Sequence, residues 1–143
     1  MIKEIEAGIL GAVINEPKLI DVISPLLKPE HFSEYNHLIV FKAIKELFND
    51  REQIDTFSII NKIKSYKQLE TIGGIYFITG LISSASQYGT LEKNSLLIIE
   101  NHVLKSLEIL AKKLEIKTKE SLVDSIEIMQ WIQNELKEIE TEL

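Results

Sequence analysis

Hydrophobic residues recur three and four positions apart over most of this chain, which is the spacing of one face of an α-helix. The first such stripe covers residues 2–14 and predicts an amphipathic helix there. Gly8 and Gly11 lie inside the stripe. Because a glycine costs about 1 kcal/mol relative to alanine in a helix interior, we expect these two glycines to serve a close contact with another helix.

Four shorter helical segments are predicted in the next seventy residues. They cover residues 17–27, 33–49, 55–66 and 75–82. Pro17 suits the first turn of a helix. Ser33 is expected to cap the segment 33–49, and either Asp55 or Thr56 the segment 55–66. The polar stretch 83–89 has no periodicity and is predicted to be a hinge. Residues 1–89 are therefore predicted to form a helical head.

The C-terminal part of the chain carries two longer apolar patterns. Residues 91–117 predict one long helix, and a short turn over 117–120 follows. Beyond the turn, leucine or methionine recurs every seven residues, as in a heptad seam. The position three residues later is isoleucine, except for Ser125, which is the weak point of the seam. We expect residues 90–143 to form an antiparallel hairpin, closed within the chain or across a dimer. The candidate self-association residues are Leu122, Met129, Ile132, Leu136 and Ile139.

The sequence therefore predicts an all-α fold, with a globular head of about five helices and a C-terminal two-helix hairpin. The composition supports this: 45% of the 143 residues are hydrophobic and 27% are charged, as in ordinary globular proteins. The chain has no cysteine, which excludes a disulfide framework, a zinc–thiolate site, an iron–sulfur cluster and a thiol nucleophile.

Charge argues against several function classes. The net charge is −6, and residues 118–143 contribute −5 of it, from two lysines and seven acidic residues. An acidic chain with one arginine, Arg51, is a poor candidate for tight binding of DNA or RNA. No apolar run reaches the roughly 18–20 residues that cross a membrane. Glu4 and Glu6 do not fit a secretory signal, so we expect a cytoplasmic protein.

No pattern points to catalysis. None of the six glycines is followed by lysine, so a phosphate-cradling loop is not expected. Glu34 and His37 share the three-residue spacing of some carboxylate metal sites, but no second such pair faces them in the sequence, and a structural role is expected. Ser83, Ser84 and Ser86 have no nearby base. We therefore expect no catalytic, cofactor-binding or metal-binding residue, and predict a helical interaction module.

Three residues are candidates for contact with a partner. They are Tyr88 in the polar stretch, Leu96 near the start of the long helix, and Trp131 in the hairpin. Tryptophan is enriched in interface hot spots, although packing within the hairpin is the commoner role for such a residue.

Several stretches, in order, resemble the N-terminal domain of bacterial replicative DNA helicases, the DnaB family. The match begins with Glu-Ala-Gly-Ile-Leu-Gly-Ala at residues 6–12 and continues with Leu-Lys-Pro-Glu-His-Phe at 27–32. It runs on through residues 37–44, Ile54-Asp55, the Gly-Gly-Ile-Tyr turn at 73–76, and Ile98-Ile99-Glu100. Order and spacing agree from about residue 4 to residue 105, while the hairpin beyond agrees in pattern.

The resemblance implies a non-catalytic collar domain above a motor ring. In that family the domain pairs through its C-terminal hairpin, assembles as a trimer of dimers and docks the C-terminal domain of primase, and in some systems it meets the helicase loader. An ATPase motor domain, which would bind ATP and magnesium, is not among these 143 residues.

The sequence is also compatible with other hypotheses for the function. A stand-alone regulator from a phage or mobile element would mimic the collar to bind primase or a loader. The helicase-binding domain of a primase has a related helical architecture, but the N-terminal matches argue against it. An enzyme is the least supported reading, because no constellation of residues favours one.

Overall fold

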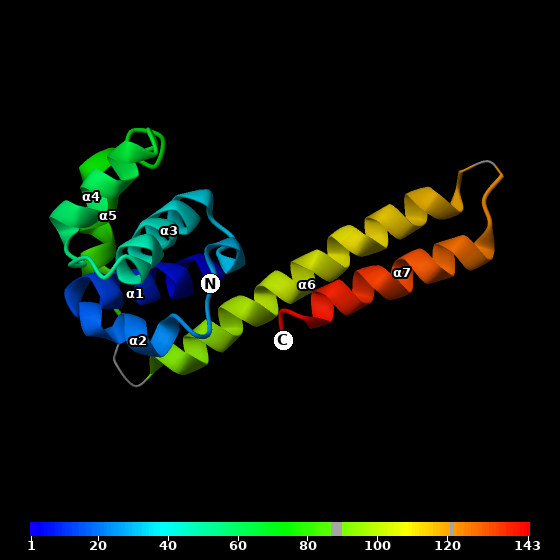
Figure 1. The fold of residues 1–143 in the computed structure, drawn as a ribbon, viewed down its shortest axis with the longest axis horizontal. Coiled ribbons are helices and arrows are strands. Elements are labelled where there is room, and N and C mark those ends of the chain that lie inside the picture. Colours follow the sequence, from blue (N-terminus) through cyan, green and yellow to red (C-terminus); the bar gives the residue numbers. More distant parts are fainter. Residues whose placement is uncertain (87–89, 121) are drawn as a thin grey trace. The chain divides into compact units, whose positions relative to one another are not determined.

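The computed structural model describes residues 1–86, 90–120 and 122–143 and confirms the all-α class. The described residues form seven α-helices and two short 3₁₀ helices and contain no strand (Figure 1). The α-helices are α1 (Ile2–Asn15), α2 (Ile20–Ile23), α3 (Tyr35–Asn49), α4 (Thr56–Ser65), α5 (Gly74–Ser83), α6 (Leu91–Thr118) and α7 (Ser125–Glu140). The 3₁₀ helices are Pro17–Leu19 and Pro29–His31.

The chain divides into two compact units, Met1–Ile98 and Ile99–Leu143. Helix α6 begins in the first unit and continues in the second. We describe each unit by itself. Among the described residues, no helix combines the length and the apolar character needed to cross a bilayer.

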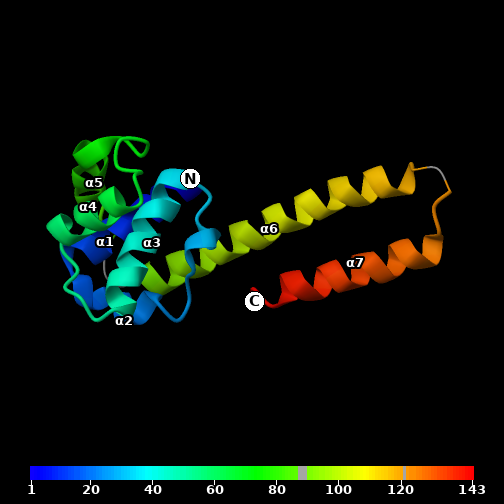
Figure 2. The ribbon, with the colours of Figure 1, turned by 45° about the horizontal axis from the view of Figure 1, so that its top comes forward.

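The core of the first unit is built around α1. This helix packs against α5 and α3, and α4 packs against both α3 and α5 (Figure 2). Burial along α1 runs without a break from Gly8 to Ile14, because neighbouring helices cover more than one of its faces. The fully buried large side chains of this unit include Ile9, Leu10, Ile23, Leu27, Phe41, Ile44, Leu47, Ile59, Ile63, Ile72, Ile78 and Ile98.

The close contact with another helix expected from Gly8 and Gly11 is confirmed for Gly11, while Gly8 meets the residues that follow α5. A β-carbon at Gly11 would collide with the backbone carbonyl oxygen of Leu81 on α5, and one at Gly8 would collide with the Ser86 hydroxyl. The Ser86 N–H donates to the carbonyl of Gly8 at 2.9 Å. Glycine is therefore required at Gly11 because the backbone of α5 meets α1 there, and at Gly8 because the Ser86 side chain lies against α1.

Helix boundaries follow the sequence in some places and not in others. Asp55 caps α4, since its carboxylate accepts a hydrogen bond from the Ser58 N–H at 2.7 Å. Ser33 does not cap α3, as we had expected. The residue before α3 is Glu34, and both the N–H and the hydroxyl of Ser33 donate to the carboxylate of Glu6 on α1.

The segment expected over residues 17–27 divides into two short pieces. A 3₁₀ helix over Pro17–Leu19 leads into the four-residue α2, which ends before Pro25. Pro17 does occupy the first turn, as predicted. The second 3₁₀ helix, Pro29–His31, was not predicted. It is closed by a hydrogen bond from the Lys28 N–H to Nδ1 of His31 at 3.0 Å.

The hairpin is confirmed, and α6 and α7 run antiparallel side by side in both views (Figures 1 and 2). The predicted heptad repeat began at Leu122, and this part of the prediction is wrong because Leu122 precedes α7. The carboxylate of Asp124 accepts from the Ile126 N–H at 2.8 Å and starts α7 at Ser125. Leu122 lies in the turn with φ +58° and is fully exposed.

The α1–α5 contact yields a prediction about stability. Replacing Gly11→Ala should destabilise the fold by about 1–3 kcal/mol, since the new methyl group overpacks against a backbone carbonyl. Gly80 is the matched control, because a β-carbon there meets nothing within 4 Å and the position is exposed on α5. Gly80→Ala should be neutral or stabilising by up to about 1 kcal/mol. Chemical denaturation followed by circular dichroism measures both, and equal midpoints for the two variants would contradict the packing argument.

Candidate interaction surfaces

Helix α7 carries seven apolar residues, yet none of its residues is buried. Met129 and Leu136 are 54% and 39% exposed, and Ile126 is 60% exposed. Ile132 and Ile139 are half-buried. Ile139 and Leu110 of α6 line the same small pocket between the two helices. The five predicted self-association residues thus separate into an outward group (Met129, Leu136), a more sheltered group (Ile132, Ile139) and the turn residue Leu122.

The α6 side of the second unit also exposes apolar side chains. Those more than a third exposed are Leu104, Leu107, Ile109 and Ile116. Apolar side chains that gather on the surface of a folded protein often mark interaction sites. Both helices of the hairpin therefore present apolar surface that the second unit does not bury itself.

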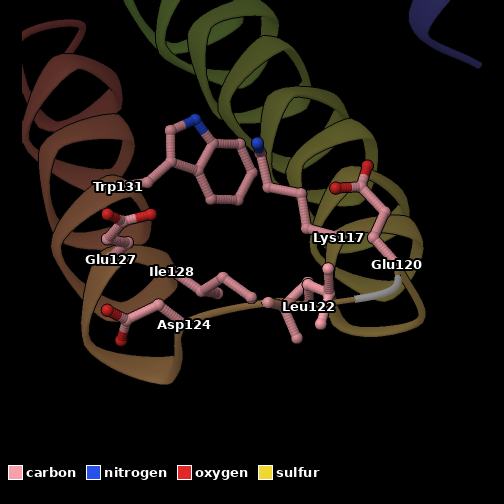
Figure 3. A pocket seen from close by; sticks show the side chains of 8 residues that line it. Lys117, Glu120, Leu122, Asp124, Glu127, Ile128 and Trp131 are labelled. Carbon is pink, nitrogen blue, oxygen red and sulfur yellow. The ribbon is translucent and has the colours of Figure 1, made fainter.

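Trp131 lies near the turn, packed under a lysine of the facing helix. The Nζ atom of Lys117 lies 4.8 Å from the centre of the Trp131 ring, a cation–π contact. Both side chains line a hollow of about 320 Å³ at the turn. Figure 3 shows Glu120, Asp124 and Glu127 around the same hollow. Trp131 is half-buried, so it has a packing role in the hairpin while part of its surface stays accessible.

The other two candidate docking residues lie elsewhere. Leu96 is 53% exposed on the part of α6 that belongs to the first unit. Tyr88 lies outside the described residues, as does the end of the predicted hinge. The partner-docking roles of Tyr88, Leu96 and Trp131 therefore stay predictions.

A groove of about 570 Å³ lies in the first unit between α1 and α5. Its lining is mostly apolar and includes Ala7 of α1 with Phe77, Gly80 and Leu81 of α5. Tyr76 lines it too and is 90% exposed. His37 of α3 is a polar member of the lining, and its ring stacks on Phe77 with centroids 5.8 Å apart.

His37 belongs to a buried polar cluster centred on Glu6. The Glu6 side chain is fully buried, and one of its carboxylate oxygens lies 2.9 Å from Nδ1 of His37. The other accepts from the N–H of Ser33 at 2.8 Å and from its hydroxyl at 2.7 Å. The Glu34 N–H adds a longer bond of 3.3 Å. Glu6 thus ties α1 to the start of α3.

The pairing of Glu6 with His37 was not foreseen from the sequence. We had paired His37 with Glu34 on the same helix, because only local spacing was visible. The signal that existed was weaker: Glu6 is a charged residue inside the apolar stripe of residues 2–14. A charge there needs a partner from another element.

The hydrogen bonds of Glu6 shift its ionisation. Burial alone raises the pKa of this carboxyl, but the bonds from His37, from Ser33 and from the Glu34 backbone lower it further than burial raises it. The pKa of Glu6 therefore lies below its ordinary value, and the residue is a carboxylate at neutral pH. The Nδ1 atom of His37 then donates to it.

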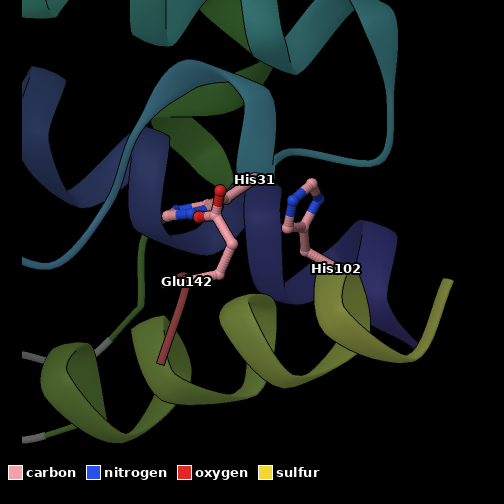
Figure 4. Close-up of side chains that lie close together, drawn as sticks. All are labelled: His31, His102 and Glu142. Atoms are coloured by element: carbon pink, nitrogen blue, oxygen red, sulfur yellow. The ribbon is translucent and has the colours of Figure 1, made fainter. Parts of the chain in front are cut away.

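Figure 4 labels three further polar side chains, His31, His102 and Glu142. His102 lies on α6 and Glu142 follows α7, both in the second unit, and one ligand atom of each lies within 4.8 Å of the other. His31 belongs to the first unit, where its ring closes the Pro29–His31 turn. Two side chains of one unit fall short of the four ligands of a structural metal site.

Comparison with known proteins finds a family and several relatives that match this chain. Residues 2–100 match the family described as the DnaB-like helicase N-terminal domain. The chain is 25% identical over 107 residues to the replicative DNA helicase DnaB of Rhodothermus marinus and 28% identical over 104 residues to that of Geobacillus stearothermophilus. These alignments cover 75% and 73% of this chain but 11% and 23% of the relatives.

Two solved structures share the fold. The N-terminal domain of DnaB helicase from Mycobacterium tuberculosis superposes with a TM-score of 0.85 at 20% identity, covering 94% of this chain and 95% of that one. A DnaB-like replicative helicase, solved with its interactions with primase, gives a TM-score of 0.76 at 23% identity, covering 96% of this chain and 31% of that one. The fold, hairpin included, is therefore that of a known domain.

The Glu6 cluster predicts a pH-dependent stability. Glu6→Gln should lower the free energy of unfolding by about 1.5–3 kcal/mol at pH 7, since it removes a buried, charge-assisted acceptor. Because the folded pKa is depressed, this contribution is present above the ordinary carboxyl value of 4.5 and is lost as pH falls through the lower folded value. The difference in the free energy of unfolding between wild type and Glu6→Gln should therefore become smaller below about pH 4.5.

Urea denaturation at several pH values measures that gap. Glu70→Gln is the control, because Glu70 is exposed, and it should stay within about 0.5 kcal/mol of wild type at pH 7. A gap for Glu6→Gln that stays constant down to pH 3 would contradict the ionised cluster.

Proposed function

Because this chain belongs to the DnaB-like helicase N-terminal domain family, we propose that it is a non-catalytic collar domain that supports helicase ring assembly and docks primase during DNA replication. The observation that carries the proposal is the uncovered hairpin: α7 buries none of its residues, and apolar side chains stand exposed on both helices. The proposal assigns ATP and magnesium to a motor domain and no cofactor to these residues. Such a role belongs in the cytoplasm.

Self-association is the first part of the proposal. A 16-residue helix is marginal by itself in water, so covering α7 with a second hairpin would stabilise both. A two-fold pairing would place the same patch of each copy in contact. Met129 and Leu136 are the central residues of that patch, and Ile132 and Ile139 lie at its sheltered edge. A trimer of such dimers is the ring arrangement that the family resemblance implies.

Primase docking is the second part. The relative with a TM-score of 0.76 is a DnaB-like helicase whose interactions with primase were solved, and its fold covers 96% of this chain. We propose that the C-terminal domain of primase docks on this chain as well, with Leu96, Trp131 and Tyr88 as candidate contacts. A helicase loader is a further candidate partner in the same role.

Substituting charged residues for exposed apolar residues of the hairpin tests the proposed self-association. Met129→Glu combined with Leu136→Glu should weaken the dimer at least tenfold, because two carboxylates per copy would enter an apolar contact. The matched control is Gln130→Glu with Asn134→Glu, which adds the same charge at exposed positions of the same helix. Sedimentation equilibrium measures the dissociation constant. If both double variants weakened the dimer equally, the added net charge alone would explain the loss. If the dimer survived Met129→Glu with Leu136→Glu, this face of α7 would not be the dimer interface.

The primase role has a direct test. Calorimetric titration of the chain with the C-terminal domain of the primase from the same genome, at two salt concentrations, should give saturable binding with a micromolar or tighter dissociation constant. A folded and self-associated chain that binds no primase domain would contradict this part of the proposal. In that case a structural collar would remain, and the loader would be titrated next.

A further inference from the structure

In the second unit, α6 carries an exposed apolar stripe beside the side that faces α7. Leu110 faces α7, since it lines a small pocket together with residues of that helix, and Val103 lies on the same side two turns earlier. Leu104 and Ala111 each follow one of these buried residues and are exposed, and Leu107 lies between them on the same stripe. One residue is a rotation of about 100° around an α-helix. The exposed stripe is therefore about a quarter-turn from the inward side.

Helix α7 repeats this arrangement. Ile128 and Glu135 are half-buried and line hollows that they share with residues of α6. Met129 and Leu136 are the residues that follow them, and both are exposed. The exposed stripe of α7 thus also lies about a quarter-turn beyond the inward side, counted in the direction of the chain.

The two exposed stripes lie on the same face of the hairpin. Helices α6 and α7 run antiparallel (Figure 1). Seen along the hairpin, one helix approaches the viewer and the other recedes, so equal rotations along the two chains run in opposite senses. Each stripe is therefore displaced toward the same side. We call this side the apolar face, and its residues are Leu104, Leu107, Ala111, Met129 and Leu136.

The opposite face of the hairpin is mixed in character. Its residues from α7 are Glu127, Asn134 and Glu138, each of which precedes a half-buried residue and is exposed. Its residues from α6 include Ile109 and Ile116, which are 55% and 64% exposed. A helical partner on that side would bury two carboxylates together with the isoleucines, which is costly. The apolar face is therefore the better surface for a second hairpin.

The two helices that form the apolar face differ in charge. Residues 99–119 contain five lysines and three glutamates, a net charge of +2, while residues 120–143 contain seven acidic residues and one lysine, a net charge of −6. Charges on neighbouring helices interact because the screening length at physiological salt is about 8 Å. A face with one positive and one negative half is complementary to a copy of itself turned by 180°. This self-complementarity identifies a second copy of the chain as the occupant.

We propose that two copies pair through the apolar face with the two-fold axis parallel to the helices, so that α7 of each copy lies against α6 of the other. A two-fold axis across the helices would instead place α7 on α7 and bring two strongly acidic helices together. The pairing rests on the proposed self-association, and adds to it the face that is used and the orientation of the copies.

This orientation also matches side chains by size. Leu110 and Glu135 line the same pocket, so Ala111 and Leu136, the residues that follow them, lie at about the same level of the hairpin. A two-fold axis parallel to the helices leaves that level unchanged. Leu136 of one copy therefore faces Ala111 of the other, and a large side chain opposite a small one lets two helix surfaces interdigitate.

Cysteine cross-linking of the full chain tests the orientation. The chain has no cysteine, so Ala111→Cys and Leu136→Cys each introduce a single thiol at an exposed position. A disulfide requires Cα atoms within about 7 Å of each other. With oxidised glutathione, a mixture of the two variants should give a disulfide-linked dimer on a non-reducing gel, and each variant alone should give none, because like positions lie diagonally across the bundle.

Asn134→Cys is the matched control. Asn134 is exposed on the same helix as Leu136, but on the opposite face of the hairpin. Its mixture with Ala111→Cys should give no cross-linked dimer. Cross-linking in this control equal to that of the first mixture would overturn the assignment of the apolar face.

Sedimentation of the same variants under reducing conditions separates the orientation from self-association itself. Dimers that cross-link in Leu136→Cys alone, and not in the mixture with Ala111→Cys, would overturn the orientation and leave the proposed self-association in place. Variants and wild type that all remain monomeric would overturn both.

Discussion

The first unit depends on the approach of α5 to α1, where backbone meets backbone. At Gly11 any side chain would strike the carbonyl of Leu81, and at Gly8 the carbonyl accepts the N–H of Ser86. Interiors packed at the density of crystals do not absorb an extra methyl group at such a point. The same helix pair bounds the groove through Ala7 and Gly80. Glu6 ties α1 to the start of α3 and orients His37 beside it.

The two units present different chemistry to a partner. The second unit exposes apolar side chains on both helices of a hairpin in which α7 buries nothing, and broad apolar faces suit pairing between similar helices. The first unit offers a mostly apolar groove between α1 and α5, with His37 of α3 in its lining. The proposed pairing of copies would use the apolar hairpin of the second unit.

Much of the fold was predictable because it rests on local rules. The 3.6-residue period located the long helices to within a few residues. Asp55 was one of the two caps predicted for α4, because an N-cap bond spans only three residues. Gly8 and Gly11, which lie within an apolar helical stripe, predicted a close contact with another helix. The predictions failed where a contact with a residue distant in sequence, or the cap of the next helix, overrode the local pattern. Ser33 has the chemistry of a cap, but Glu6, 27 residues away, takes both of its donors. Leu122 fits the heptad, but Asp124 begins the helix after it.

The sequence by itself therefore determined the helices, the all-α class, the hairpin and, through ordered short motifs, the family. Only the tertiary structure decided which polar residues are buried together and which apolar ones stay exposed. Periodicity reports the face of a helix on which a residue lies, but not which element packs against that face. Glu6 and His37 are 31 positions apart, and no spacing rule joins them. Met129 and Ile139 belong to one heptad pattern, but the antiparallel placement of α6 beside α7 leaves the first outward and shelters the second.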